Sequence, residues 1–315
     1  MRLKLVPNET KIDFLGLRKI AGVVSAAAMV ISVLAMILFG LNFGIDFRGG
    51  VLVEARTEQA ADLGEIRSLL GSLDLGDVAV QEFGDERTIL TRIERQPGGG
   101  DAQDAAKERI SAALQEAFPG TSIRRTEVVG PKVSGELVQA GVTAVILAVL
   151  AVLFYIWLRF EWQFSLGAVA ALVHDVVLTL GIFALLGLEF NLSIIAALLT
   201  IVGYSLNDTV VVFDRIRENL RRYKSTELID VLNLSINETL SRTLMTSVTT
   251  LIALFSLYFF GGEVIRGFTF AMILGVLVGT YSSIFIAAPV LHWLGVKRDW
   301  DTGSEPDGKA GVQFG

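Results

Sequence analysis

The residues of this sequence best placed to do chemistry are the ionisable side chains that stand inside apolar stretches. Asp208 lies within the run 192–213, which is long enough to cross a bilayer. A second apolar run carries His174 and Asp175, and a third carries Arg242. An acid at the centre of a spanning helix costs roughly 2.5–3.5 kcal/mol to insert, so a functional role is the default interpretation. The sequence therefore predicts a buried charged cluster, contributed by three helices, as the functional site.

Asp208 and Arg242 are expected at similar depth, near one end of the helix bundle. If the fourth span ends near Asp214, Asp208 lies about 9 Å inside that boundary at ~1.5 Å per residue. If the fifth span begins near Glu238, Arg242 lies about 6 Å inside the same boundary. Thr246 follows Arg242 by one turn and shares its face, so an ion pair with a neighbouring hydroxyl is geometrically allowed. A carboxylate there can hold a proton while unpaired and release it when the guanidinium approaches, as a proton-driven switch requires.

Each of these residues also has a purely structural interpretation. Arg242 could extend its long side chain to the membrane interface, whereas Asp208 is too short to do so. His174 and Asp175 point about 100° apart on a helix, so we do not expect them to form one pair aimed at one target. Asp175 is expected to face the bundle and to meet polar groups of the fourth or fifth span. With His174 and Asn207 it would belong either to a structural polar network or to a secondary relay.

Composition places the chain in a membrane. Of its 315 residues 52% are hydrophobic, and the excess over a soluble domain comes from long apolar runs. Six runs reach spanning length, at residues 20–40, 137–158, 164–188, 192–213, 240–260 and 268–293. The first is followed by Leu41-Asn42-Phe43-Gly44, which offers no cleavage site, so we interpret it as a retained anchor rather than a signal peptide.

Basic residues predict the orientation of the bundle. Lys and Arg are concentrated in the segment 1–19, in the connection 214–237 and in the tail 294–315, whereas the short loops on the other side hold one Arg and no Lys. Positive charge marks the cytoplasmic side, so both termini are expected there. The second half of the connection 214–237 is amphipathic and is expected along the cytoplasmic interface. The tail from Asp301, rich in glycine and charge, is expected to be disordered.

The segment 41–136, between the first and second spans, is predicted to be a small domain on the opposite side of the membrane. Its alternating patterns predict strands at 51–55, 78–83, 88–93 and 122–129, and helices at 60–73 and 104–118. The order β-α-β-β-α-β is that of a ferredoxin-like split unit. The predicted fold is therefore a membrane all-α bundle of six transmembrane helices (137–293 holding the last five) with one small α+β ferredoxin-like domain, suited to binding or docking.

Enzymes, metal proteins and nucleic-acid binders find little support. The sequence has no cysteine and only two histidines, His174 and His292, which excludes disulfides, thiolate sites and a His-rich metal site. It contains neither a phosphate-binding loop nor the His-Glu-x-x-His zinc motif. The Gly-Asp junction of intramembrane aspartyl proteases is missing around Asp208. The arginine-rich connection 214–237 is explained by membrane orientation, so we expect no enzyme activity, cofactor, metal or nucleic-acid partner.

Four stretches together form a specific pattern. One follows the first span and contains Gly44, Asp46, Arg48, Gly49 and Gly50. In full, the four are Asn42-Phe43-Gly44-Ile45-Asp46-Phe47-Arg48-Gly49-Gly50, His174-Asp175, Asn207-Asp208-Thr209-Val210-Val211-Val212-Phe213-Asp214-Arg215-Ile216-Arg217-Glu218-Asn219 and Ser241-Arg242-Thr243. With them the chain resembles the SecD/SecF family of bacterial protein-export proteins, on its SecF side, over nearly its whole length.

The resemblance implies one half of a transporter of the RND (resistance, nodulation and division) superfamily, in the bacterial inner membrane, with cytoplasmic termini and a periplasmic domain at 41–136. It implies a heterodimer with SecD, association with the SecYEG translocon and its accessory subunits, and contact with the translocating preprotein and membrane lipid. The pair would use the proton-motive force in late translocation. Asp208 would be the proton-path acid, Arg242 its basic partner and Thr246 a polar neighbour, with the remaining acid supplied by SecD. Whether the coupling ion is H⁺ or Na⁺ stays open, because a carboxylate beside hydroxyls suits either.

Two other functions remain compatible with the sequence. One is a non-catalytic scaffold that stabilises the translocon or SecD. The other is half of an RND-like exporter of small molecules, although the domain 41–136 is far smaller than a drug-binding region would need.

Overall fold

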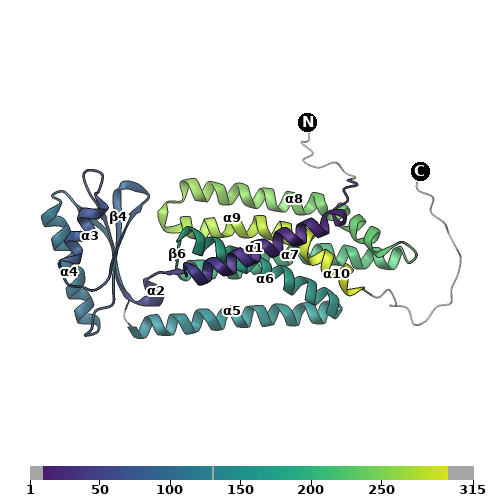
Figure 1. The fold of residues 1–315 in the computed structure, drawn as a ribbon, viewed down its shortest axis with the longest axis horizontal. Helices are drawn as coiled ribbons and strands as arrows, with labels where there is room; N and C mark the ends of the chain where they lie inside the picture. Colours follow the sequence, from purple (N-terminus) through teal and green to yellow (C-terminus); the bar gives the residue numbers. More distant parts are fainter. Residues whose placement is uncertain (1–9, 130, 297–315) are drawn as a thin grey trace.

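The computed structural model describes residues 10–129 and 131–296. Within them, six helices are long and apolar enough to cross a membrane, and one small α+β domain stands at the end of the bundle (Figure 1). The predicted fold class is therefore confirmed. The basic residues Arg2 and Lys4 and the tail from Asp301, for which disorder is predicted, lie outside the described residues.

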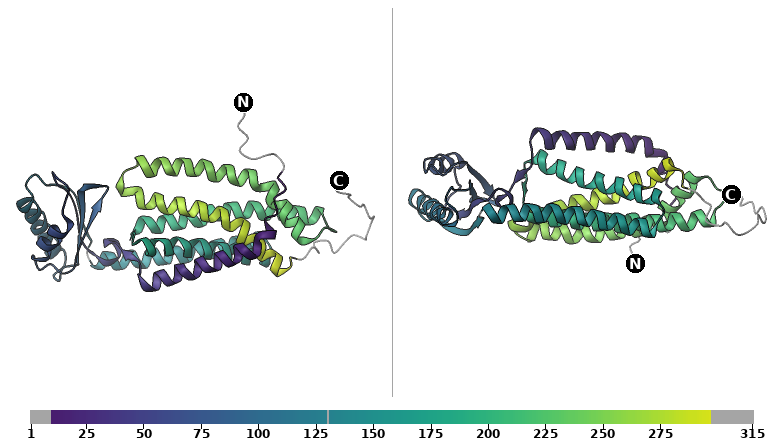
Figure 2. Two further views of the ribbon diagram at one scale, coloured as in Figure 1. Left: turned by 45° about the horizontal axis from the view of Figure 1, so that its top comes forward. Right: turned by 90° about the horizontal axis from the view of Figure 1, so that it is seen from below.

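The bundle consists of long, nearly parallel helices. Figure 2 shows α1 at the margin of the bundle in both further views, beside α6. The helices are α1 (Arg18–Leu38, after the short turn η1 at Leu15–Leu17), α5 (Pro131–Arg159), α6 (Trp162–Leu186), α7 (Leu192–Arg222), α8 (Leu228–Phe260) and α9 (Glu263–Ser282), which continues through the π-helical turn η2 (Ser283–Ala287) into α10 (Ala288–Leu294).

The predicted connection 214–237 proves to be mostly helix. Helix α7 runs on to Arg222 and α8 already begins at Leu228, so the segment consists of two helix ends and a short turn rather than a long loop. The reason lies in the apolar face of the second half: Val231, Leu232 and Ile236 are buried in one core with Ile216 and other residues of α7. The amphipathic pattern therefore reflects packing between two helix extensions rather than contact with lipid.

The α+β domain has the predicted ferredoxin-like order. Its strands and helices are β2 (Gly50–Arg56), α3 (Leu63–Gly71), β3 (Val78–Phe83), β4 (Asp85–Ile93), α4 (Gly100–Ala117) and β5 (Ser122–Val129). The sheet order is β3-β4-β2-β5 and every neighbouring pair is antiparallel. Helices α3 and α4 cover one face (Figure 1), where Ile66 and Ile110 pack on Val51 and Ile89.

The other face of the sheet contacts a short junction to the bundle. Leu52 and Leu90 pack on Ile45, which begins the four-residue helix α2 (Ile45–Arg48). Just before it, β1 (Asn42–Phe43) pairs in parallel with β6 (Glu189–Phe190), between α6 and α7. Two-residue strands leave no periodic signal, so the sequence alone gave no indication of this pairing. The junction therefore joins the exit of the first span to the entry of the fourth.

Three polar contacts fix the junction. The Asp46 carboxylate accepts a hydrogen bond from the backbone N–H of Leu192 (2.9 Å), at the first residue of α7, where the positive end of the helix dipole favours an anion. Arg92 of β4 donates to the carbonyl of Phe43 (2.8 Å) and to the side chain of Asn42 (3.3 Å). The first motif after span one is thus a mechanical coupling between the domain and α7.

Two charged groups at the junction are shifted by burial. Burial raises the pKa of Glu189 above its usual 4.5, and the attraction of Arg92 only partly opposes this shift. Burial likewise lowers the pKa of the Arg92 guanidinium below its usual range. Both groups therefore hold their charge at a cost, because neither is fully compensated by the other.

Gly50 is the tightest backbone position of the junction. Its φ is +125°, and a Cβ there would lie 2.3 Å from the carbonyl oxygen of Ile93. We predict that Gly50→Ala destabilises the domain by about 2–6 kcal/mol, since overpacking and a strained φ each cost on the order of 1–3 kcal/mol. Amide hydrogen exchange in β2 and β4 measures the effect. Gly71→Ala, with nothing within 4 Å of the added Cβ, is the control, and equal protection in both variants would contradict the prediction.

The raised pKa of Glu189 gives a second prediction. The folded protein binds this proton more tightly than the unfolded chain, so stability falls as pH rises above 4.5 and levels off beyond the folded pKa. Glu189→Gln should therefore raise the thermal midpoint at pH 7, on the order of a few degrees, and the gain should vanish below pH 4.5. Exposed Glu116→Gln serves as the control. A lower midpoint for Glu189→Gln at pH 7 would show that ionised Glu189 is net stabilising.

Candidate functional site: two buried carboxylates joined by hydroxyls

Asp208 lies in the interior of the bundle, only 7% exposed. Its Oδ1 accepts a hydrogen bond from Thr243 Oγ1 (2.5 Å) on α8, and its Oδ2 accepts one from Ser283 Oγ (2.7 Å) at the start of the turn η2. Three separate helical segments therefore meet at this carboxylate. Both partners are hydroxyl groups, which can donate to a carboxylate and accept from a carboxylic acid.

The ion pair between Asp208 and Arg242, which the sequence allows but does not require, is absent from the described residues. Among the ion pairs within 4.0 Å that the described residues make, none joins these two side chains. Thr243, one residue after Arg242, faces α7 instead, because consecutive helical residues point about 100° apart. The Thr246 hydroxyl is bonded to the backbone carbonyls of Arg242 (3.1 Å) and Thr243 (2.9 Å). Hydroxyl groups, rather than a guanidinium, thus surround the acid.

The expected agreement in depth nevertheless holds. Asp208 lies 14 positions before Arg222, the end of α7, and Arg242 lies 14 positions after Leu228, the start of α8. At ~1.5 Å per residue, both are about 21 Å from the turn that joins the two helices. Arg242 and Thr246 are exposed on the chain surface at this depth, as is Asn207. The three predicted polar residues therefore face outward while Asp208 faces inward.

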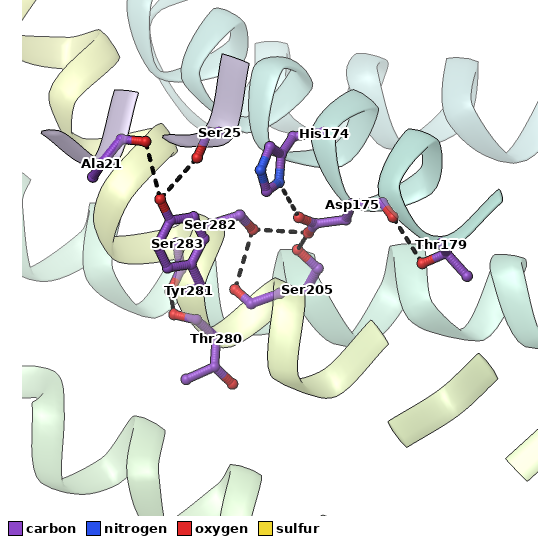
Figure 3. A network of polar contacts seen from close by, with 11 residues as sticks. Ala21, Ser25, His174, Asp175, Thr179, Ser205, Thr280, Tyr281, Ser282 and Ser283 are labelled. Carbon is purple, nitrogen blue, oxygen red and sulfur yellow. Dashed lines mark hydrogen bonds and ion pairs between the residues drawn. The ribbon is translucent and has the colours of Figure 1, made fainter. Parts of the chain in front are cut away.

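A second carboxylate, Asp175 on α6, is completely buried, and Figure 3 shows it among the side chains of Ser205, Ser282 and His174. Its Oδ2 accepts hydrogen bonds from Ser205 Oγ of α7 (2.6 Å) and Ser282 Oγ of α9 (2.8 Å). The expectation that Asp175 faces the bundle and meets the fourth span is confirmed. The expectation for its neighbour is wrong: His174 Nδ1 lies 3.0 Å from Asp175 Oδ1, so the two do form a pair. The imidazole of His174 bends toward Asp175, although the two side chains leave the helix about 100° apart.

Sequence reasoning missed the residues that hold the two acids. Ser205, Ser282 and Ser283 lie in apolar stretches, where a single hydroxyl hardly lowers hydropathy and carries no charge. The signal that could have identified some of them is their position relative to the charged residues. Ser205 precedes Asp208 by about one turn, and Thr243 belongs to the Ser241-Arg242-Thr243 stretch. The pair Ser282-Ser283 became significant only when the turn η2 placed it between α6 and α7.

The first motif lies away from the acids, at the other end of the same helix. Asp46 caps α7 at Leu192, 16 positions before Asp208, while Gly49 (φ +71°) and Gly50 turn the chain into β2. A cavity of about 580 Å³ lies between domain and bundle, lined by Asp46, Glu189 and apolar side chains of α9, among others. The described residues show no group of three or more His, Cys, Asp or Glu that could hold a metal ion.

Comparisons with known proteins agree with this architecture. The family model of the C-terminal part of the protein export membrane proteins SecD and SecF matches residues 109–297, and that of the SecD/SecF GG motif matches residues 34–61. The protein translocase subunit SecF of Cereibacter sphaeroides is 49% identical, over 99% of this chain and 98% of its own length. That of Rickettsia felis is 47% identical, over 92% and 94% respectively.

Solved structures show the same relation. The crystal structure of SecDF from Thermus thermophilus, a translocon-associated membrane protein, matches with a TM-score of 0.82 at 35% identity, covering 93% of this chain and 40% of that chain. SecDF in a super-membrane-facing form matches with a TM-score of 0.66 at the same identity and coverage. This chain thus spans less than half of the SecDF chains but nearly all of the SecF relatives. It belongs to the SecD/SecF family of protein export membrane proteins, among which it is similar over its full length to the SecF subunits.

Proposed function

We propose that this subunit works with SecD to couple the proton-motive force to late steps of protein translocation through SecYEG in the bacterial inner membrane, with Asp208 as the group that takes up and releases the coupling proton. The proposal rests above all on the setting of Asp208, a buried acid held by hydroxyls from two other helical segments. Such hydroxyls can reverse their hydrogen bonds when the acid is protonated, so neither charge state leaves a buried polar group unpaired.

Helix α7 offers a route from the acid to the domain. Asp208 and the capped residue Leu192 lie on the same helix, and Asp46, which makes the cap, belongs to the junction that leads into β2. A displacement of α7 on protonation would therefore reach the domain directly. One elementary charge crossing 100 mV is worth ~2.3 kcal/mol, enough to bias a two-state motion of the domain. In this proposal the domain is periplasmic, both termini are cytoplasmic, and the moving domain acts on the preprotein.

The outward-facing polar residues support SecD as the partner that completes the site. Arg242, Thr246, Asn207 and Thr200 are exposed within the spanning helices α7 and α8, where contact with lipid would be costly. Along α7 the exposed stripe also contains the small residues Ser193, Ala196 and Gly203, a composition typical of helix contacts in membranes. SecD would cover this surface and place a second acid beside Arg242. The function needs no nucleotide site or cofactor in this chain.

The coupling role of Asp208 can be tested by its amide isostere. Asp208→Asn should reduce gradient-dependent export of a secreted reporter by up to about 50-fold, the equivalent of ~2.3 kcal/mol, and leave export without a gradient unchanged. Assembly with SecD, measured by co-purification, should persist. Thr243→Val should show a smaller loss and Thr243→Ser almost none, since serine retains the hydroxyl.

The matched control is Asp230→Asn, an exposed acid near the start of α8. Repeating the assay with a sodium gradient alone identifies the coupling ion. Full gradient-dependent export by assembled Asp208→Asn would overturn the coupling role and favour the scaffold function instead.

The contact with SecD can be tested with spin labels. The chain contains no cysteine, so Thr246→Cys or Asn207→Cys carries a single label. In lipid vesicles, accessibility of these labels to dissolved oxygen should fall when SecD is present, because protein would replace lipid around them. A label at Ile37→Cys, on the exposed side of α1 (72% exposed), should change little. Unchanged accessibility at both test positions would place SecD elsewhere.

A further inference from the structure

The two buried acids are connected by consecutive serines. Ser282, the last residue of α9, donates to Asp175 Oδ2 (2.8 Å), and Ser283, the first residue of the π-helical turn, donates to Asp208 Oδ2 (2.7 Å). Consecutive residues diverge by about 100° on a helix, so this segment reaches one acid on α6 and the other on α7. π-Helical turns are rare and often occur at functional sites. Because Ser282 and Ser283 are adjacent, a movement of the segment that carries both would change the hydrogen bonds of both acids.

His174 is a buried base with one unused position. Its Nδ1 is occupied by Asp175, while its Nε2 is buried and has no hydrogen-bond partner among the described residues. The ring is 3% exposed and stacks on Tyr281, with ring centroids 5.9 Å apart and an interplanar angle of 28°. With Nδ1–H donating to the carboxylate, Nε2 carries a free lone pair. The pair can therefore accept one proton, at Nε2, without losing its existing hydrogen bond.

Tyr281, on which His174 stacks, connects the pair to the first span. The Tyr281 hydroxyl lies 2.8 Å from Ser25 Oγ and donates to the carbonyl of Ala21 (3.1 Å), both on α1 (Figure 3). The groups of α1 that contact the Tyr281 hydroxyl are thus the Ser25 hydroxyl and the Ala21 carbonyl. Among the described residues, the titratable group Tyr281 of α9 stacks on the pair, and Asp208 of α7 is reached through the two serines. Helix α1 leads directly into the junction at Asn42.

We propose that His174 and Asp175 form a second proton-binding centre. Its proton affinity is coupled to that of Asp208 through the hydroxyls of Ser282 and Ser283. The inference rests on the proposed role of Asp208 as the first proton site. Protonation of Asp208 reverses or releases the Ser283 bond, the turn shifts, and Ser282 alters its bond to Asp175. The proton affinity of the pair then changes, and by reciprocity a proton on His174 changes that of Asp208.

Nitrogen NMR of His174 tests this directly. The full chain, labelled with ¹⁵N-histidine and reconstituted with unlabelled SecD in lipid, carries only two histidines, and His292→Gln assigns the remaining signal to His174. Spectra are recorded over a range of pH values, and we expect the signal of His174 Nε2 to report a proton at the acid end of that range. In Asp208→Asn and in Ser283→Ala the midpoint should move by about one pH unit, a tenfold change in proton affinity.

Two controls distinguish loss of the hydroxyl link between the two acids from a general disturbance of the structure. Ser283→Thr retains the hydroxyl and should keep the original midpoint, and so should Ser256→Ala, which removes an exposed serine hydroxyl of α8. A His174 that stays neutral across the whole range, or one whose midpoint is the same in Asp208→Asn, would overturn the inference. Export is measured separately, so neither result decides the role of Asp208. That role is tested by the reporter assay alone.

Discussion

Most of this architecture depends on one constraint: a carboxylate taken out of water must find hydrogen-bond donors among its neighbours. Asp208 and Asp175 find theirs in hydroxyls carried by other helices, so α6, α7, α8 and the turn after α9 have to pack closely. Small residues make the approach possible. An added Cβ at Gly275 would lie 2.2 Å from Ile201 Cγ1, and one at Gly279 would lie 3.0 Å from Ser205 Cβ. Helix α9 therefore lies against α7 at the depth where its serines reach both acids.

The same helix that holds Asp208 also anchors the α+β domain. Asp46 caps the first turn of α7, and the parallel pairing of β1 with β6 ties the exit of span one to this point. The glycines after Asp46 then allow the chain to enter the sheet at once, against the backbone of β4. The motif after the first span is consequently a mechanical element. Its charged neighbours Glu189 and Arg92 are partly desolvated, which leaves the junction sensitive to the protonation of Glu189.

The polar residues of the spanning helices fall into two groups, one in the interior of the bundle and one on its outer surface. In the interior, Asp175 and Asp208 accept hydrogen bonds from hydroxyls of other helical segments. Arg242, Thr246 and Asn207, in contrast, face outward at the depth of Asp208. An outward polar surface in a spanning helix calls for a partner. The chain spans 40% of the SecDF chain to which it is similar. Asp208, first notable for its cost in lipid, thus lies at the depth of an outward-facing polar surface on the same helix pair.

The sequence by itself determined the six spans, the ferredoxin-like order of the domain and the positions of the acids, because each depends on local periodicity or on a charge in an apolar run. It also placed Asp208 and Arg242 at equal depth, since helical rise is constant. Only the tertiary structure decided the partners. Which face of α8 meets α7, where the π-helical turn falls and how His174 reaches Asp175 depend on packing between distant segments. The roles of hydroxyls such as those of Ser282 and Ser283 follow only from that packing, because a hydroxyl stabilises the fold through the hydrogen bonds that it forms with other residues.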